Sequence, residues 1–167
     1  MFNNEMAFKK IINDPYQVVD EMVEGIVLAH SDLLKFANNN KRAVVRKDAP
    51  IKDKVGVLIG GGSGHEPAFL GYVGKGLADG AAIGNVFASP SPDPIVDATK
   101  AINGGKGVVY MYGNYAGDIM NFDMAAEMCQ MEDIPVKTVL VTDDIASAPL
   151  DKKSERRGVA GDFYVFK

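Results

Sequence analysis

The sequence predicts one α/β domain, residues 1–167, built around a mostly parallel sheet that is flanked by helices and carries its candidate sites on loops at the carboxyl ends of strands. Short apolar runs alternate with helical patterns at the spacing typical of βα units. Three of these runs precede loops rich in Gly, Pro, Ser, Asn and Asp. The chain has 167 residues, 47% apolar and 24% charged, which is sufficient for one core.

The first third of the chain predicts a helix and a shorter helical stretch. Residues 1–14 read as polar and irregular. Asp14 followed by Pro15 is a helix start signal, with Asp14 as the N-cap. Apolar residues then recur at helical spacing, so we expect an amphipathic helix that ends near His30, a residue favoured there by the helix dipole. The second stretch is expected at 32–36.

The rest of the chain alternates strands and helices. Strands are expected at the apolar runs 43–45, 55–59, 81–86, 107–112 and 136–141. Helices are expected at 69–72, at 92–102, where Pro92 starts and Asn103-Gly104-Gly105 ends the pattern, and at 122–131. Residues 113–121 and 142–159 read as loops. The apolar run 163–167 is either a last core element or part of an element within which the chain ends.

A glycine-rich segment, Gly-Gly-Gly-Ser-Gly-His-Glu-Pro at 60–67, follows the buried strand at 55–59. Glycines have no side chain to bury, so we interpret them as giving backbone freedom and close access to N–H groups. A phosphate-binding P-loop would need a lysine after Gly64, where His65 stands, and a dinucleotide fingerprint counted from Gly62 would need glycine at Pro67. The segment therefore predicts a small polar binding site, with a simple sharp turn as the alternative.

Three loops, at 60–67, 86–94 and 113–121, are expected to meet in one crevice, because ligands bind at the carboxyl ends of strands in open α/β sheets. His65 can act there as an acid or base near neutral pH. Asp118 can accept a proton from a hydroxyl group; the alternative is an aspartate that caps the following helix.

Two charged pairs outside these loops have weaker functional interpretations. Asp143-Asp144 could hold a metal ion, but a solvated loop is the favoured reading. Arg156-Arg157 is interpreted as a solvated pair, with anion contact as the alternative.

The composition excludes several classes of protein. A net charge of −4 and a pI of about 5.2 argue against nucleic acid or an anionic membrane as the main partner. No apolar run approaches the ~20 residues of a membrane span, and Met1–Met6 does not begin a secretory signal. The single cysteine, Cys129, suits a reducing cytoplasm and is expected to be a packed thiol.

Four segments together resemble the dihydroxyacetone kinase family, in its substrate-binding subunit. They are Gly-Gly-Gly-Ser-Gly-His-Glu-Pro at 60–67, Ser-Pro-Ser-Pro-Asp at 89–93, Gly-Asn-Tyr-Ala-Gly-Asp-Ile-Met-Asn-Phe at 113–122 and Arg-Arg-Gly-Val-Ala-Gly at 156–161. The resemblance begins at Ile12 and keeps the family's order over nearly the whole chain.

The resemblance implies a kinase subunit that binds a short ketose, typically dihydroxyacetone, for phosphorylation of a terminal hydroxyl. A partner subunit carries magnesium and ATP or ADP, a phosphocarrier recharges that nucleotide in some bacteria, and the family forms homodimers. No cofactor or metal is therefore expected on this chain. His65 and Asp118 match catalytic residues, and the substrate-binding set implied here is Gly62, Ser63, Gly64, His65, Gly113 and Asp118.

Two departures from the family pattern bear on substrate and completeness. Gly113 and Ala116 stand where members often have lysine and threonine, so a related ketose such as a tetrulose is an alternative substrate. Family subunits are about twice as long and form a covalent hemiaminal through a histidine that neither His30 nor His65 matches. We therefore expect this chain to be an N-terminal half, inactive alone. The alternative function is a ketose-sensing regulator of transcription without kinase activity.

Overall fold

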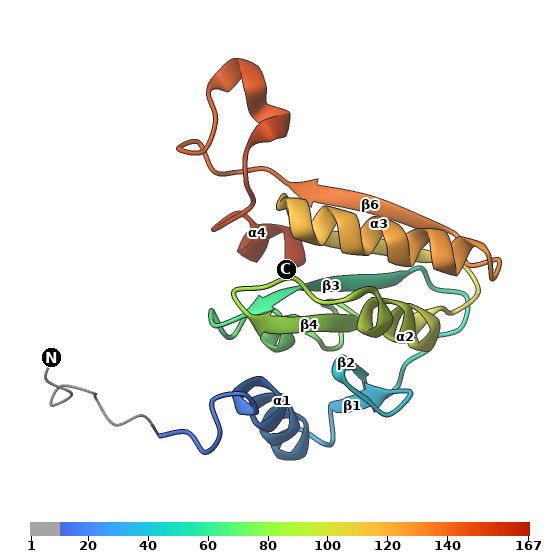
Figure 1. Ribbon diagram of the computed structural model, residues 1–167. Helices are drawn as coiled ribbons and strands as arrows, with labels where there is room; N and C mark the ends of the chain where they lie inside the picture. Colours follow the sequence, from blue (N-terminus) through green and yellow to red (C-terminus); the bar gives the residue numbers. More distant parts are fainter. Residues whose placement is uncertain (1–10) are drawn as a thin grey trace, which may run out of the picture.

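Within residues 11–167, which the computed structural model describes, a six-stranded sheet has the order β1-β2-β4-β3-β5-β6 (Figure 1). The strands are β1 Leu34–Ala37, β2 Asn40–Arg46, β3 Gly56–Ser63, β4 Gly80–Val86, β5 Val108–Gly113 and β6 Val136–Val141. The helices are α1 Val18–Ala29, α2 Pro92–Ile102, α3 Ala116–Gln130 and α4 Asp162–Phe166, with 3-10 turns η1 Leu70–Tyr72 and η2 Leu150–Glu155. The irregular segment expected at residues 1–14 lies largely outside this range.

The pairing of the strands confirms a mostly parallel sheet. β3 lies at its centre and pairs in parallel with β4 and β5, and β5 pairs in parallel with β6. The hairpin of β1 and β2 adds an antiparallel edge through β4. The carboxyl ends of β3, β4 and β5 consequently lie at the same edge of the sheet, where a ligand site is expected.

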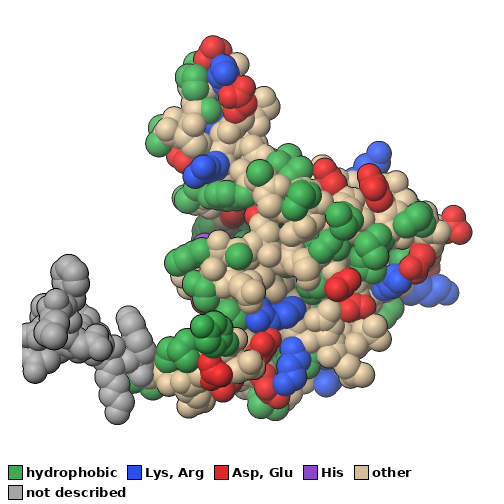
Figure 2. Space-filling view, viewed as in Figure 1, with side chains coloured by type: hydrophobic (Ala, Val, Ile, Leu, Met, Phe, Trp, Pro, Cys, Tyr) green, Lys and Arg blue, Asp and Glu red, His purple; other side chains and the backbone are tan. Residues whose placement is uncertain are grey.

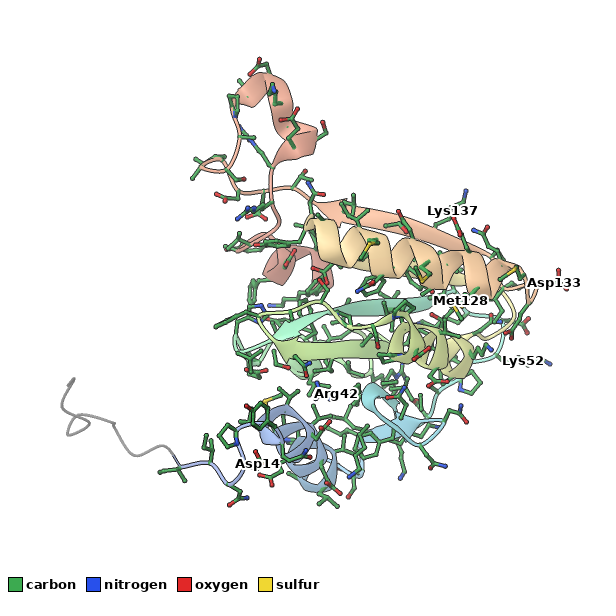
Figure 3. All side chains as sticks on the ribbon, in the orientation of Figure 1. Asp14, Arg42, Lys52, Met128, Asp133 and Lys137 are labelled. Atoms are coloured by element: carbon green, nitrogen blue, oxygen red, sulfur yellow. The ribbon has the colours of Figure 1, made fainter. Side chains whose placement is uncertain are left out.

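Helices cover both faces of the sheet and bury one apolar cluster on each. Consecutive strand residues alternate between the clusters: Leu58 packs with α2 and α3, whereas Ile59 packs with α1, η1 and α4. Phe122 of α3 is fully buried and stacks on Tyr112 at 4.1 Å between ring centroids. Met128 extends from the same helix into the layer of side chains between α3 and the sheet (Figure 3).

Arg42 of β2 ties α1 to the end of β4. Its Nε donates to Asp20 Oδ1 at 2.5 Å and its Nη1 to the Gly84 carbonyl at 3.1 Å (Figure 3). The guanidinium therefore links a helix on one face to the backbone at the sheet edge that carries the candidate site.

The structure corrects two of the elements expected in the first third of the chain and confirms one boundary. Residues 34–37 form strand β1 and not a helix, because Asn38 and Asn39 adopt positive φ in a tight turn that pairs β1 with β2. Asp14 does not cap the first helix; its carboxylate accepts the N–H of Tyr16 in a preceding turn, and α1 begins at Val18. His30 at the end of α1 is confirmed.

The first half of the glycine-rich segment, residues 60–63, is strand, contrary to the expected loop. β3 continues through Ser63, and its glycines permit close packing: a Cβ at Gly60 would lie 2.5 Å from the Ala82 carbonyl, and one at Gly61 2.4 Å from the Phe69 ring. Packing therefore does explain these glycines. Likewise, most of the expected loop at 113–121 belongs to α3, and the loop at 142–159 contains η2. The helix at 92–102 is confirmed.

No helix within residues 11–167 combines the length and the apolar character needed to cross a membrane.

Candidate functional site

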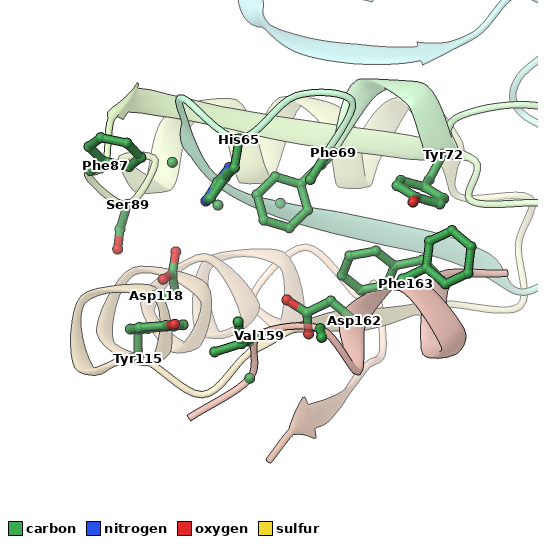
Figure 4. A pocket seen from close by; sticks show the side chains of 18 of the residues that line it. His65, Phe69, Tyr72, Phe87, Ser89, Tyr115, Asp118, Val159, Asp162 and Phe163 are labelled. Atoms are coloured by element: carbon green, nitrogen blue, oxygen red, sulfur yellow. The ribbon is translucent and has the colours of Figure 1, made fainter. Parts of the chain in front are cut away.

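A cavity of about 480 Å³ opens at the carboxyl ends of β3 and β5 (Figure 4). The three segments expected to form one crevice all line it, together with residues 158–160 and α4. Its volume is that of an ordinary small-molecule site, and aromatic rings form much of its wall. In the space-filling view a histidine is visible within a hollow beneath the protruding segment that contains η2 (Figure 2).

His65 lies on one wall of the cavity between two aromatic rings. Its ring meets Phe69 edge-on at 5.7 Å and Phe87 at 6.0 Å between centroids. The imidazole is exposed, whereas the Phe69 ring is buried beneath it. The rings thus hold the imidazole at the cavity surface, within reach of a bound molecule.

Asp118 faces His65 from the opposite wall, in the first turn of α3 (Figure 4). The residue is 8% exposed, and its Oδ1 is buried without a hydrogen-bond partner in the described part of the chain. It does not cap α3, whose N-cap is Tyr115. Burial raises the pKa of the carboxyl, while the hydroxyl of Ser89 and the imidazole of His65 act in the opposite direction. This oxygen is available to a ligand.

The other residues of the expected substrate set divide into two groups. Gly62 and Gly113 line the cavity with bare backbone. Ser63 does not line it; its hydroxyl is buried and donates to the Gly84 carbonyl at 2.8 Å. Gly64 adopts a φ of +109° and its N–H bonds to both carboxylate oxygens of Glu66 at 3.1 Å. Ser63 and Gly64 therefore shape the turn that carries His65.

Asp143 and Asp144 organise the segment that follows β6. Asp143 accepts the N–H groups of Val159 and Gly161, both at 2.8 Å, and Asp144 accepts the N–H of Ala146 at 3.0 Å. Within the described residues, no group of three or more His, Cys, Asp or Glu is placed to hold a metal ion. These carboxylates stabilise the loop conformation in which residues 158–160 line the cavity.

Arg156 corrects the expectation of a solvated arginine pair. Arg156 is only 9% exposed, and its Nε donates to the Ala148 carbonyl at 2.9 Å. Arg157 places its guanidinium 5.7 Å from the centroid of the Tyr115 ring. Cys129 is the packed thiol that was expected: it is fully buried, and burial raises its pKa.

Asp162 is the cavity residue that the sequence reasoning missed. It begins α4, and its Oδ1 is buried without a partner among the described residues. Burial, followed by the charges of Asp143 and Asp118, raises the pKa of Asp162 to about 7. The only sequence signal was its position directly after Gly161 and before the apolar run 163–167.

Comparisons with known proteins find relatives over nearly the whole chain. The Dak1 domain matches residues 24–167. The dihydroxyacetone-binding subunit DhaK of PTS-dependent dihydroxyacetone kinase 2 from Listeria innocua is 55% identical over 95% of this chain and 47% of its own length. The L-erythrulose kinase of Pectobacterium atrosepticum is 46% identical over 94% of this chain and 26% of its own.

Solved structures show the same fold. The dihydroxyacetone kinase of C. freundii superposes with a TM-score of 0.84 at 37% identity, covering 95% of this chain and 29% of that one. The dihydroxyacetone kinase operon co-activator Dha-DhaQ gives 0.79 at 32% identity, covering 89% and 45%. The chain spans about half the length of the DhaK subunit it matches. On these matches, the chain belongs to the Dak1 domain family.

Proposed function

We propose that this chain binds a short ketose in the cavity between β3 and α3 and presents a terminal hydroxyl for phosphorylation by a nucleotide-bearing partner. The observation that carries this proposal is the buried, unpartnered oxygen of Asp118, which faces the exposed imidazole of His65 across the cavity. The named relatives, a dihydroxyacetone-binding subunit and an erythrulose kinase, support a ketose as the ligand.

The two side chains have separate tasks in this proposal. Asp118 accepts a hydrogen bond, and then the proton, from the hydroxyl that is to be phosphorylated, which makes that oxygen a better nucleophile. His65, on the other wall, donates a proton to the ketose or accepts one from it. The burial of Asp118 reduces its contact with water, which strengthens its interaction with a bound molecule.

The phosphoryl donor belongs to the partner in this proposal. A magnesium-bound nucleotide supplies the phosphoryl group when the partner docks, and a phosphocarrier that recharges it is supported by the name of the PTS-dependent relative. Homodimer formation and a cytoplasmic location complete the proposal. A regulatory function remains the second candidate because of the likeness to the co-activator, but the identity of 32% to that protein is well below the 55% to the kinase subunit.

Binding by this chain can be followed at its two histidines. His65 lines the cavity, whereas His30 lies at the end of α1 in a separate hollow and serves as an internal reference. We expect dihydroxyacetone or erythrulose to shift the NMR signals of His65 and of the amides at 60–64 while His30 stays unchanged. The absence of any shift with either ketose would contradict ketose binding by this chain.

Phosphorylation by the complete subunit tests the catalytic roles. With a nucleotide-bearing partner subunit, we expect His65→Ala and Asp118→Ala each to lower kcat at least 100-fold, the lower end of a general acid–base contribution. Asp118→Ala should reduce turnover more than ketose binding. Asp151→Ala, at an exposed carboxyl of η2, is the matched control. A site variant with the wild-type rate would disprove its role, and ketose binding by the wild type without transfer would favour the regulatory function.

A further inference from the structure

A second carboxyl, that of Asp162, lines the same cavity as Asp118. Its Oδ1 is fully buried and has no hydrogen-bond partner within residues 11–167. The carboxyl lies against backbone that carries no side chains: a Cβ at Gly113 would be 3.2 Å from Asp162 Oδ2, and one at Gly158 would be 3.1 Å from Oδ1. The two glycines therefore provide the space in which this carboxyl reaches the cavity.

Within residues 11–167, no hydrogen bond or ion pair holds this carboxyl in place. Burying a polar group without a hydrogen bond costs free energy, and the neighbouring Asp143 avoids that cost by accepting two backbone N–H groups. Asp162 has no such donors, and the negative charges of Asp143 and Asp118 act on its carboxyl instead. A hydroxyl group of a ligand would supply the missing partner, because it can donate to the carboxyl when ionised and accept from it when protonated.

Asp118 and Asp162 serve different parts of the cavity. Asp118 lies near Ser89 and opposite His65, whereas Asp162 lies farther along the same wall, next to Phe163 (Figure 4). The cavity of about 480 Å³ is far larger than a three-carbon ketose. A longer ketose held at Asp118 would extend its remaining carbons and hydroxyls along this wall.

We propose that Asp162 binds a hydroxyl of the ketose other than the one that Asp118 accepts, and that it thereby selects a four-carbon ketose over a three-carbon one. The inference rests on the proposed function and names the substrate class of the same site. A site that hydrogen-bonds a substrate hydroxyl discriminates strongly against an analogue that lacks this group, because the buried carboxyl is then left without a partner. Asp162 acts here as a specificity residue.

The test compares kcat/KM for erythrulose and dihydroxyacetone, using the complete subunit with its nucleotide-bearing partner. We expect the wild type to prefer erythrulose. Asp162→Ala should lower the ratio of the two kcat/KM values at least tenfold, the effect of one lost hydrogen bond to a charged group, chiefly through a higher KM for erythrulose. Asp162→Asn, which keeps the shape, should lower it less. Asp151→Ala, at an exposed carboxyl, should leave the ratio unchanged.

The outcomes separate this inference from the function on which it rests. If the wild type phosphorylates a ketose but Asp162→Ala changes both kcat/KM values by the same factor, or changes neither, Asp162 does not select the substrate and the inference is wrong. A wild type that prefers dihydroxyacetone would also overturn it. A wild-type complex that phosphorylates neither ketose would overturn the proposed function itself.

Discussion

Replacing Asp162 by asparagine tests whether the fold holds this carboxyl in the cavity at a cost in stability. Burial and the charges of Asp143 and Asp118 raise the pKa of Asp162 from its ordinary 3.8 to about 7. Between these values the folded chain retains a proton that the unfolded chain has released. The stability associated with the neutral carboxyl is therefore present at low pH and is lost as the pH rises towards 7.

The size of the effect follows from the pKa shift. One pKa unit corresponds to about 1.4 kcal/mol, so the complete shift sets an upper limit of about 4 kcal/mol on the destabilisation above pH 7. The variant D162N has nearly the same shape and carries no charge at any pH. We expect its free energy of unfolding to exceed that of the wild type by a margin that grows by about 1 kcal/mol per pH unit from pH 5 to pH 7 and then levels off.

Urea denaturation followed by circular dichroism at pH 5, 6, 7 and 8 measures this margin. Asp151→Asn provides the control, because Asp151 is exposed on η2 and the same chemical change there should give a margin independent of pH. A D162N margin that stays constant across the series would refute the reasoning. So would a wild type that gains stability over D162N as the pH rises, since that result requires a carboxylate stabilised by the fold.

Two further substitutions test the packing that positions the site. Asp79→Ala should lower the free energy of unfolding by about 3–5 kcal/mol in urea denaturation, because it removes a buried carboxylate that accepts from Arg46, Lys54 and the Val57 N–H. Asp48→Ala, at the exposed partner of the same arginine, should lower it by much less, and equal losses would contradict this assignment. Gly62→Ala would place a Cβ 2.7 Å from the backbone of the loop after β4, so the ketose affinity measured by NMR titration should fall at least tenfold. Gly74→Ala is the control, because a Cβ there would meet open space and binding should be normal. Unchanged binding by Gly62→Ala would show that the loop can move without cost to the site.

Local sequence signals correctly predicted one helix and the parallel strands of the sheet. The helix at 92–102 has a proline at its start and glycines after its end, and the parallel strands are apolar runs of the right length. Strand β1 was misassigned because it is only four residues long, which is too short for a local pattern to separate strand from helix, and its pairing with β2 decides its conformation. Long-range pairing of this kind overrides local propensity.

The glycines of β3 are a second case in which long-range contacts override local propensity. A run of glycines predicts a loop from propensity alone, yet here it is a central strand. The reason lies in contacts that the sequence does not display: the Phe69 ring and the Ala82 carbonyl lie where side chains at Gly61 and Gly60 would be. His65 and Asp118 could still be singled out as site candidates, because each follows the end of a strand in a segment rich in small residues.

Asp162 could not be found in this way, because its position depends on three segments at once. The carboxyl reaches the cavity only where Gly113, at the end of β5, and Gly158 both lack a side chain. Residues 158–161 lie there in turn because Asp143, just after β6, accepts the N–H groups of Val159 and Gly161. In the proposed function, substrate selection is therefore a joint property of Asp162 and the two glycines, and the absence of a side chain at Gly113 contributes to it by giving the carboxyl its place.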